Sequence, residues 1–435
     1  MKQTTASPTR PLKPFLVLWS GQAASLFGSQ LVQFALIWWL TTTTGSATTL
    51  ALASLMGLLP QVVLGPFVGV LVDRWNRRMT MLLADGLVAL ATVVLVLLFW
   101  SGQTAVWHVF VVLFVRALGG AFHWPAMQSS TTLMVPQDYL TRIQGLNQTL
   151  NGSLNIVSAP LGALLLDVLP MQGVLMIDVI TAVFAIIPLL IIHIPQPDVP
   201  ARPSGQPANF WREFWADMSA GLRYLRTLPA LMLLMGMAMI INLVLNPAFT
   251  LMPLLVTNHF QGTALHLGFI ESSFGVGVLI GGLLLSVWGG FQRRIVTSLV
   301  GLITMGIAIL LVGITPAGLF WLAVAATFVV GTSNSLTNGP VLALFQVLVV
   351  PEMQGRIFTL LNSLAAAMSP LGLILAGPLA DQLGVQAWFV IGGTVTILMG
   401  VIAFFIPMIM NMEDATAVTL SAAPLGETAV ADPTL

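Results

Sequence analysis

Among the charged residues inside long apolar stretches of this chain, where charges are unfavourable and usually functional, three are candidates for chemistry. Arg116 lies near the middle of one stretch, so we expect it to face the interior of a helical bundle and to have a partner. Asp178 and Glu271 lie one to two turns inside two other stretches. Because burial favours the neutral form of a carboxyl group, both acids are candidates for proton coupling, with Arg116 as their regulator.

Each of these three residues also has a structural interpretation. Arg116 can be held by backbone carbonyls alone, without any part in transport. The two acids can lie in interfacial water near helix starts, where a carboxylate complements the positive end of the helix dipole. Residue type and position leave both interpretations open.

Uncharged polar residues recur at helical spacing on three other apolar stretches and are candidates for a substrate path. These residues are Gln22, Ser25, Ser29 and Gln33, then Asn147, Asn151 and Asn155, then Asn242 and Asn246. Such a face either lines a water-filled path or forms hydrogen bonds between helices, and spacing does not distinguish the two. His123 is a further candidate for ligand contact, with a packed histidine as the alternative.

A compact charge cluster separates two of the apolar stretches. It consists of Gly69, Asp73, Arg74, Arg77 and Arg78. We expect a tight loop here, and the glycine at its start favours close helix packing. Asn76 stands before the last two arginines, and asparagine tolerates left-handed backbone angles. Asp85, early in the next stretch, is expected to be a structural partner of the loop arginines.

Composition places the elements that carry these residues in lipid. Hydrophobic residues make up 57% of the 435 and charged residues 7%, against roughly 25% charged residues in soluble domains. The net charge of zero implies no attraction to nucleic acid, and the absence of cysteine excludes disulfides and thiolate metal sites. The lysines are Lys2 and Lys13, so no phosphate-binding loop exists. We expect no enzyme activity, no catalytic residue, no metal and no cofactor.

The apolar stretches predict an all-α integral membrane protein with twelve transmembrane helices in two six-helix bundles. Each stretch is long enough for a hydrocarbon core of about 30 Å. The predicted spans are 15–40, 47–72, 79–100, 105–134, 141–168, 172–192, 231–256, 265–288, 295–313, 318–349, 357–380 and 386–410. The predicted organisation is a first bundle over 1–192, a linker with a surface-lying amphipathic helix over 193–230, a second bundle over 231–410, and a disordered tail over 411–435.

Basic residues predict the orientation. Of the 15 lysines and arginines, all but Arg116 fall before the first span, in the linker, or in loops on the same side of the membrane. Cytoplasmic loops carry an excess of basic residues, so both termini are predicted to be cytoplasmic.

The two halves repeat one another. Ala159-Pro160-Leu161-Gly162 corresponds to Ser369-Pro370-Leu371-Gly372, and Asp167 corresponds to Asp381. Parallel six-helix repeats are typical of facilitator-type transporters, with a substrate path between the halves.

The charge cluster resembles the signature loop of the major facilitator superfamily, and Arg116-Ala-Leu-Gly119-Gly120 resembles its arginine motif, which the family implicates in proton coupling. Further segments resemble the macrolide-efflux group of these transporters. They include Gly21-Gln22-Ala23, Thr44-Gly45-Ser46-Ala47, Ile177-Asp178-Val179 and Ile280-Gly281-Gly282-Leu283-Leu284. The resemblance extends over nearly all of 15–410 and implies the major facilitator fold, the cell membrane and proton-coupled drug efflux.

We therefore expect a monomeric secondary transporter that exports amphipathic, macrolide-like compounds in exchange for protons. Its cytoplasmic loop is expected to act as a latch between the halves. A siderophore or metabolite exporter of the same superfamily remains open, as does a non-transporting membrane receptor or scaffold. The short linker and tail, without a recognisable signalling domain, count against the last alternative.

Overall fold

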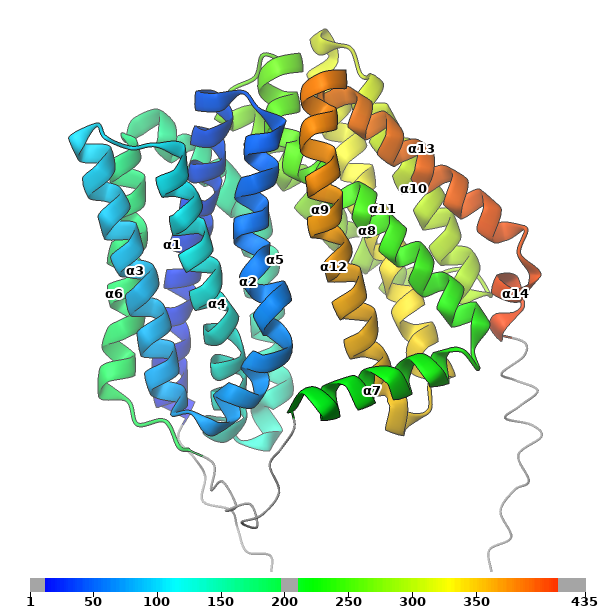
Figure 1. Ribbon diagram of the computed structural model, residues 1–435, viewed down its shortest axis with the longest axis horizontal. Helices are drawn as coiled ribbons and strands as arrows, with labels where there is room; N and C mark the ends of the chain where they lie inside the picture. The colour runs from blue at the N-terminus through cyan, green and yellow to red at the C-terminus, as the bar shows by residue number, and fades with distance from the viewer. Residues whose placement is uncertain (1–11, 197–209, 414–435) are drawn as a thin grey trace, which may run out of the picture.

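The computed structural model describes residues 12–196 and 210–413, which are almost entirely helical (Figure 1). Of the helices in this part of the chain, 12 are long and apolar enough to cross a membrane, which confirms the predicted number of spans. The N-terminal half contains α1 (Leu12–Thr44), α2 (Ala47–Arg74), α3 (Arg77–Ser101), α4 (Val106–Met134), α5 (Gln137–Val168) and α6 (Met171–Ile191).

The C-terminal half follows a helix that lies outside both bundles, α7 (Phe210–Leu225). This half contains α8 (Pro229–Leu254) with a π-helical continuation (Leu255–His259), α9 (Ala264–Trp288), α10 (Arg294–Ile314), a 3-10 turn (Ala317–Leu319), α11 (Phe320–Leu348), α12 (Pro351–Leu383), α13 (Val385–Phe404) and α14 (Pro407–Met410). The predicted span 386–410 is therefore two helices. The proline at the start of α14 explains the break, because its ring cannot continue a preceding helix.

Figure 1 shows the two halves side by side, with α2 facing α12 at the centre. We call the end that carries Leu12, Arg77 and Arg294 the basic end, and the end that carries Ser46 and Gly384 the distal end. Helix α7 crosses the basic end beneath α12 (Figure 1). The tail 414–435 and the segment 197–209 lie outside the described residues.

Local capping fixes the turns between the first three helices. The Ser46 hydroxyl accepts from the Thr49 amide at 3.3 Å and caps α2. The Asn76 side chain accepts from the Met79 amide at 3.1 Å and caps α3. Asn76 has an extended backbone with φ of −66°, so its role is capping and it does not adopt the left-handed conformation.

Glycines set the close helix approaches that position the site. A Cβ atom on Gly28 of α1 would lie 3.2 Å from the Asp178 Cα atom of α6. A Cβ atom on Gly119 of α4 would lie 2.6 Å from the side chain of Val88 in α3. The absence of a side chain at these two positions brings α6 against α1 and α3 against α4.

The sequence repeat is visible in the packing. Gly162 of α5 lies against the Phe34 ring of α1. Gly372, its counterpart in α12, lies against the backbone of Leu243 in α8. Because α1 and α8 begin the two halves, the same contact is built twice from corresponding helices.

The halves meet most closely toward the distal end. The Asp381 carboxylate at the end of α12 accepts from the amides of Ala47 and Thr48 at 2.6 and 3.1 Å, and from the Ser46 hydroxyl at 3.1 Å. A carboxylate from one half therefore caps the first helix turn of α2 in the other half, where the helix dipole favours negative charge. Figure 1 shows α2 and α12 diverging from there toward the basic end.

Candidate functional site

A cavity of about 660 Å³ lies in the N-terminal half and opens toward α8 of the other half. It is lined by all four polar residues of the predicted stripe on α1, namely Gln22, Ser25, Ser29 and Gln33. The structure adds Gln61 from α2 to this wall. A polar, partly enclosed space of this volume is large enough for a drug-sized molecule.

Arg116 forms a buried ion pair with Asp178 in the wall of this cavity. The Arg116 guanidinium also donates to the Thr92 hydroxyl at 3.0 Å and to the Ser29 carbonyl at 3.1 Å. Asp178 in turn accepts from the Ser29 hydroxyl at 2.9 Å and from the Thr92 hydroxyl at 3.0 Å. Four helices thus satisfy both charges, as a charge buried in a membrane protein requires.

A second buried carboxylate, Asp85, faces the same cavity. Its Oδ2 atom accepts from the Gln22 side chain at 3.0 Å, and its Oδ1 atom lies 3.4 Å from His123 Nε2. The prediction that Asp85 pairs with the loop arginines is wrong. Position 85 is eight residues into α3, about 12 Å along its axis from Arg77, and the side chain points into the bundle.

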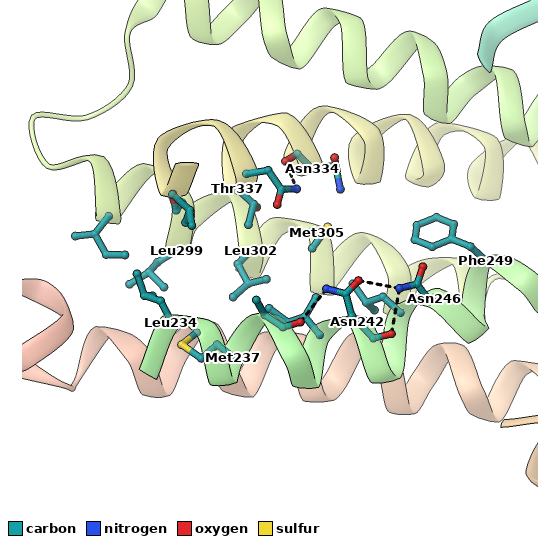
Figure 2. A pocket seen from close by; sticks show the side chains of 17 residues that line it. Leu234, Met237, Asn242, Asn246, Phe249, Leu299, Leu302, Met305, Asn334 and Thr337 are labelled. Carbon is teal, nitrogen blue, oxygen red and sulfur yellow. Dashed lines mark hydrogen bonds between the residues drawn. The ribbon is translucent and has the colours of Figure 1, made fainter. Parts of the chain in front are cut away.

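A separate cavity of about 220 Å³ lies inside the C-terminal half (Figure 2). Asn242 and Asn246 of α8 line it, as the predicted stripe requires, and the two side chains are joined by a 2.8 Å hydrogen bond. Asn334 and Asn338 of α11 contribute further amide groups. The remaining wall is mostly aliphatic, and none of the described residues that line this cavity is charged.

The two cavities share part of their walls. Asn246 and Phe249 of α8 border both of them, so the charged cavity and the neutral cavity are neighbours across the interface between the halves. Asn246 also donates to the Ser369 hydroxyl of α12 at 2.8 Å, which holds this wall in place.

Glu271 lies apart from the Arg116 cluster. Its side chain is exposed on α9, does not line either cavity, and forms no hydrogen bond or ion pair with another described residue. It is one turn from Phe274, whose ring centroid lies 5.3 Å from that of Phe249 in the shared wall. Residues three apart lie on the same helix face, so Glu271 and Phe274 share one side of α9.

Only part of the predicted polar stripe on α5 borders a cavity. Asn147 accepts from the Trp19 indole at 2.7 Å, and Asn151 joins it in the wall of a small pocket of about 30 Å³ that also contacts His123. Asn155 borders none of these spaces, and its backbone packs against Gly275 of α9.

The described arginines of the charge cluster bind within the N-terminal half. Arg77 donates to the Ser129 carbonyl at 3.2 Å, and Arg78 donates to the carbonyls of Leu189 and Leu190 at the end of α6. Cations at a helix C-terminus complement its dipole. Gly69 and the side chains of Asp73 and Arg74 lie outside the described residues.

Sequence reasoning missed three parts of this arrangement. Asp85 belongs to the cavity wall, and the signal was an acid inside an apolar stretch, the same signal that identified Asp178. Asn334 and Asn338 are four residues apart, as in the stripes that were recognised. Asp381 caps α2, a role that no local pattern indicates.

Comparisons with known proteins agree with this architecture. The family model described as Major Facilitator Superfamily matches residues 18–373. The chain is 38% identical to macrolide efflux protein A of Streptococcus pyogenes over 399 residues, which covers 92% of this chain and 97% of that protein. It is 26% identical to the multidrug efflux pump Tap of Mycolicibacterium fortuitum over 415 residues, which covers 93% and 98%.

A solved structure shares the fold at low sequence identity. It is a bacterial homologue of the human lysosomal transporter Spinster, in an inward-facing and unoccupied conformation. The TM-score is 0.65 at 14% identity, with 96% of this chain and 99% of that chain covered. The chain belongs to the Major Facilitator Superfamily and is a multi-pass transporter of small molecules in the bacterial cell membrane.

Proposed function

We propose that this protein exports amphipathic, macrolide-like compounds across the cell membrane in exchange for protons. The 38% identity to a protein named for macrolide efflux, over 92% of the chain, supports the export direction and the compound class. The similarity to a multidrug efflux pump supports a site that accepts more than one compound. We expect a monomer to be the working unit, because each chain contains both halves of the path.

The observation that carries this proposal is the cavity of about 660 Å³ with buried charges in its wall, next to a neutral cavity in the other half. An amphipathic compound needs polar contacts for one part and apolar contacts for the rest, and the two spaces supply them in adjacent walls. They adjoin at the interface between the two repeated six-helix halves, which is where facilitator-type transporters bind their substrates.

The orientation follows from charge. The basic end carries the described loop arginines, so the positive-inside rule assigns it to the cytoplasm. The halves contact one another toward the distal end, and α2 and α12 diverge toward the basic end (Figure 1), which supports a conformation open to the cytoplasm. Such a conformation would load substrate from inside the cell.

Proton coupling is assigned to the ion pair of Arg116 and Asp178 and to Glu271. A proton on Asp178 would release Arg116, because a neutral carboxyl no longer compensates the guanidinium. Glu271 forms no ion pair among the described residues and has an exposed side chain, which supports proton exchange at this position. The loop around Asp73 would close the cytoplasmic end as a latch in the opposite conformation.

Efflux from cells expressing the chain tests the proposal. A macrolide and a lipophilic dye are loaded, and their retention is compared with vector-only cells, with and without a protonophore. Protonophore-sensitive efflux of either compound is the expected result. If well-expressing cells export neither, the drug-export proposal is wrong.

A further inference from the structure

The chain after α13 returns to the basic end of the C-terminal half and is held there. We call Pro407–Glu413 the C-terminal strap; it contains α14 and the three residues that follow it. Ile409 is 0% exposed and Met412 is 5% exposed, and both pack in one hydrophobic core cluster of this half. The Arg293 guanidinium donates to the Met410 carbonyl at 3.1 Å. The strap is therefore an integral part of the half, fixed by apolar contacts and by a hydrogen bond.

The strap supplies the N-terminal cap that α10 lacks locally. The N-cap residue of α10 is Arg293, whose side chain contains no hydrogen-bond acceptor and makes no capping bond. Instead, the Glu413 Oε1 atom accepts from the Ile295 amide at 2.9 Å. A carboxylate at a helix N-terminus also interacts favourably with the helix dipole. The first turn of α10 is thus fixed by a residue that lies 118 positions away in the sequence.

The first turns of α10 form one wall of the neutral cavity. Four residues of these turns line the cavity at helical spacing, namely Ile295, Ser298, Leu299 and Leu302. Figure 2 shows Leu299 and Leu302 beside Leu234 of α8 around this space. Ile295 and Leu299 also belong to the core cluster that contains Met412 of the strap. The strap and this cavity wall are therefore parts of one packed unit.

The wall of the neutral cavity is suited to an uncharged group that forms hydrogen bonds. None of the described residues that line it is charged, so a charged ligand group would lose its water without gaining a counterion. The Ser298 hydroxyl is buried and has no hydrogen-bond partner among the described residues. Asn334 and Asn338 add amide groups from α11. Hydroxyl and carbonyl groups of a ligand can pair with these side chains, while its apolar frame contacts the aliphatic wall.

We propose that the C-terminal strap positions the first turn of α10, so that this turn and the asparagines of α11 bind an uncharged group with hydroxyl or carbonyl oxygens. In this role Glu413 is a positioning residue, because it contacts the Ile295 amide and does not line the cavity. The assignment rests on the proposed function, in which the neutral cavity holds the uncharged part of the exported compound. It adds a dependence of that cavity on the strap.

The N-terminal half contains a similar contact and offers a matched control. Helix α6 is followed by Gln196, whose Oε1 atom accepts from the Arg77 amide at the start of α3 at 3.2 Å. Helix α3 also has its own cap, since the Asn76 side chain accepts from the Met79 amide at 3.1 Å. Removing the Gln196 side chain therefore leaves α3 capped. Removing the Glu413 side chain leaves α10 without a side-chain cap among the described residues.

Hydrogen–deuterium exchange of the purified full-length protein tests the positioning step. Glu413→Ala should accelerate exchange in peptides that cover 294–305 by about fivefold, because the loss of a helix cap shifts local opening by roughly this factor. Glu413→Gln keeps an acceptor oxygen and should restore most of the protection. Gln196→Ala should leave exchange in α10 unchanged. If exchange in 294–305 is the same in Glu413→Ala as in the wild type, the strap does not position α10.

Equilibrium dialysis with cortisol tests the ligand step. Cortisol is an uncharged probe with hydroxyl and carbonyl groups on an apolar frame. The wild type is expected to bind it, and Ser298→Ala and Glu413→Ala should each weaken binding by at least about threefold, the effect of one lost hydrogen bond. Glu413→Gln and Gln196→Ala should bind as the wild type does. Absence of cortisol binding by the wild type, or normal binding by Glu413→Ala, would overturn the assignment.

Thermal unfolding confirms that each variant is folded. Glu413→Asp, whose carboxylate is one methylene group shorter, keeps both tests valid if Glu413→Ala does not fold, and it should show the same two effects. Macrolide efflux is measured in parallel. Efflux without strap-dependent cortisol binding rejects only the strap assignment, whereas strap-dependent cortisol binding without any efflux rejects only the export proposal.

Discussion

His123 lies two turns from Arg116 on the same face of α4, about 10 Å along the helix axis. One helix therefore places a guanidinium against Asp178 and an imidazole against Asp85. The cavity wall thus contains two acid–base contacts at different depths, and the first variant below tests the contact between Arg116 and Asp178.

Asp178→Asn is expected to destabilise the protein by about 3–5 kcal/mol, because it leaves Arg116 as an uncompensated buried charge. The double variant Arg116→Gln/Asp178→Asn should recover most of this stability without recovering transport. Thermal unfolding in detergent and efflux measure the two effects. If Asp178→Asn alone is as stable as the wild type, the Asp178 carboxylate does not compensate the charge of Arg116.

Glu271→Gln is expected to abolish efflux driven by a pH gradient while leaving drug binding intact, because the variant keeps the shape but cannot exchange a proton. Proteoliposomes with an imposed pH gradient measure transport, and equilibrium dialysis measures binding. Asp138→Asn, an exposed acid in the first turn of α5, serves as the control. Gradient-driven transport by Glu271→Gln at the wild-type rate would remove Glu271 from the coupling mechanism.

Asp381→Asn is expected to loosen the distal closure, because it removes the charged acceptor of the α2 amides. A hydrogen bond of this kind contributes about 1–2 kcal/mol, so the ratio of distally open to closed protein should rise by roughly tenfold. Since the chain contains no cysteine, spin labels can be placed at Thr43→Cys and Gln382→Cys and their separation measured. If Asp381→Asn leaves the distance distribution between the two labels unchanged, Asp381 does not hold the distal ends of the halves together.

Gly28→Ala is expected to lower the free energy of unfolding by about 1–3 kcal/mol and to impair transport. The new methyl group would meet Thr181 and the Asp178 backbone, and would push α6 away from α1. Gly86→Ala is the matched control, because a Cβ atom there meets nothing within 4 Å. Thermal unfolding and efflux of the two variants should diverge, and equal behaviour would contradict the packing argument.

Asp73→Asn is expected to reduce efflux without changing folding, because the latch forms only in the conformation closed to the cytoplasm. Efflux is compared at equal expression, and thermal unfolding confirms that the fold is intact. Normal efflux by the well-expressed variant would reject the latch.

The sequence by itself determined the number of membrane-spanning helices and the membrane class. Span length and hydrophobicity are local properties set by the thickness of the bilayer, so each of the 12 membrane-spanning helices can be recognised separately. The stripes on α1 and α8 were recognised in the same way, since helical spacing places their residues on one face.

Only the tertiary structure decided which charges meet. Arg116, Asp178 and Ser29 come from α4, α6 and α1, and their contact depends on how closely those helices approach at Gly28. The short distance in sequence from Asp85 to the loop arginines suggested a partnership that helix rise and side-chain direction exclude. Asp381 reaches α2 from 334 residues away. Which residues pair across helices depends on the depth and the rotation of each helix in the bundle. A single stretch of sequence determines neither quantity.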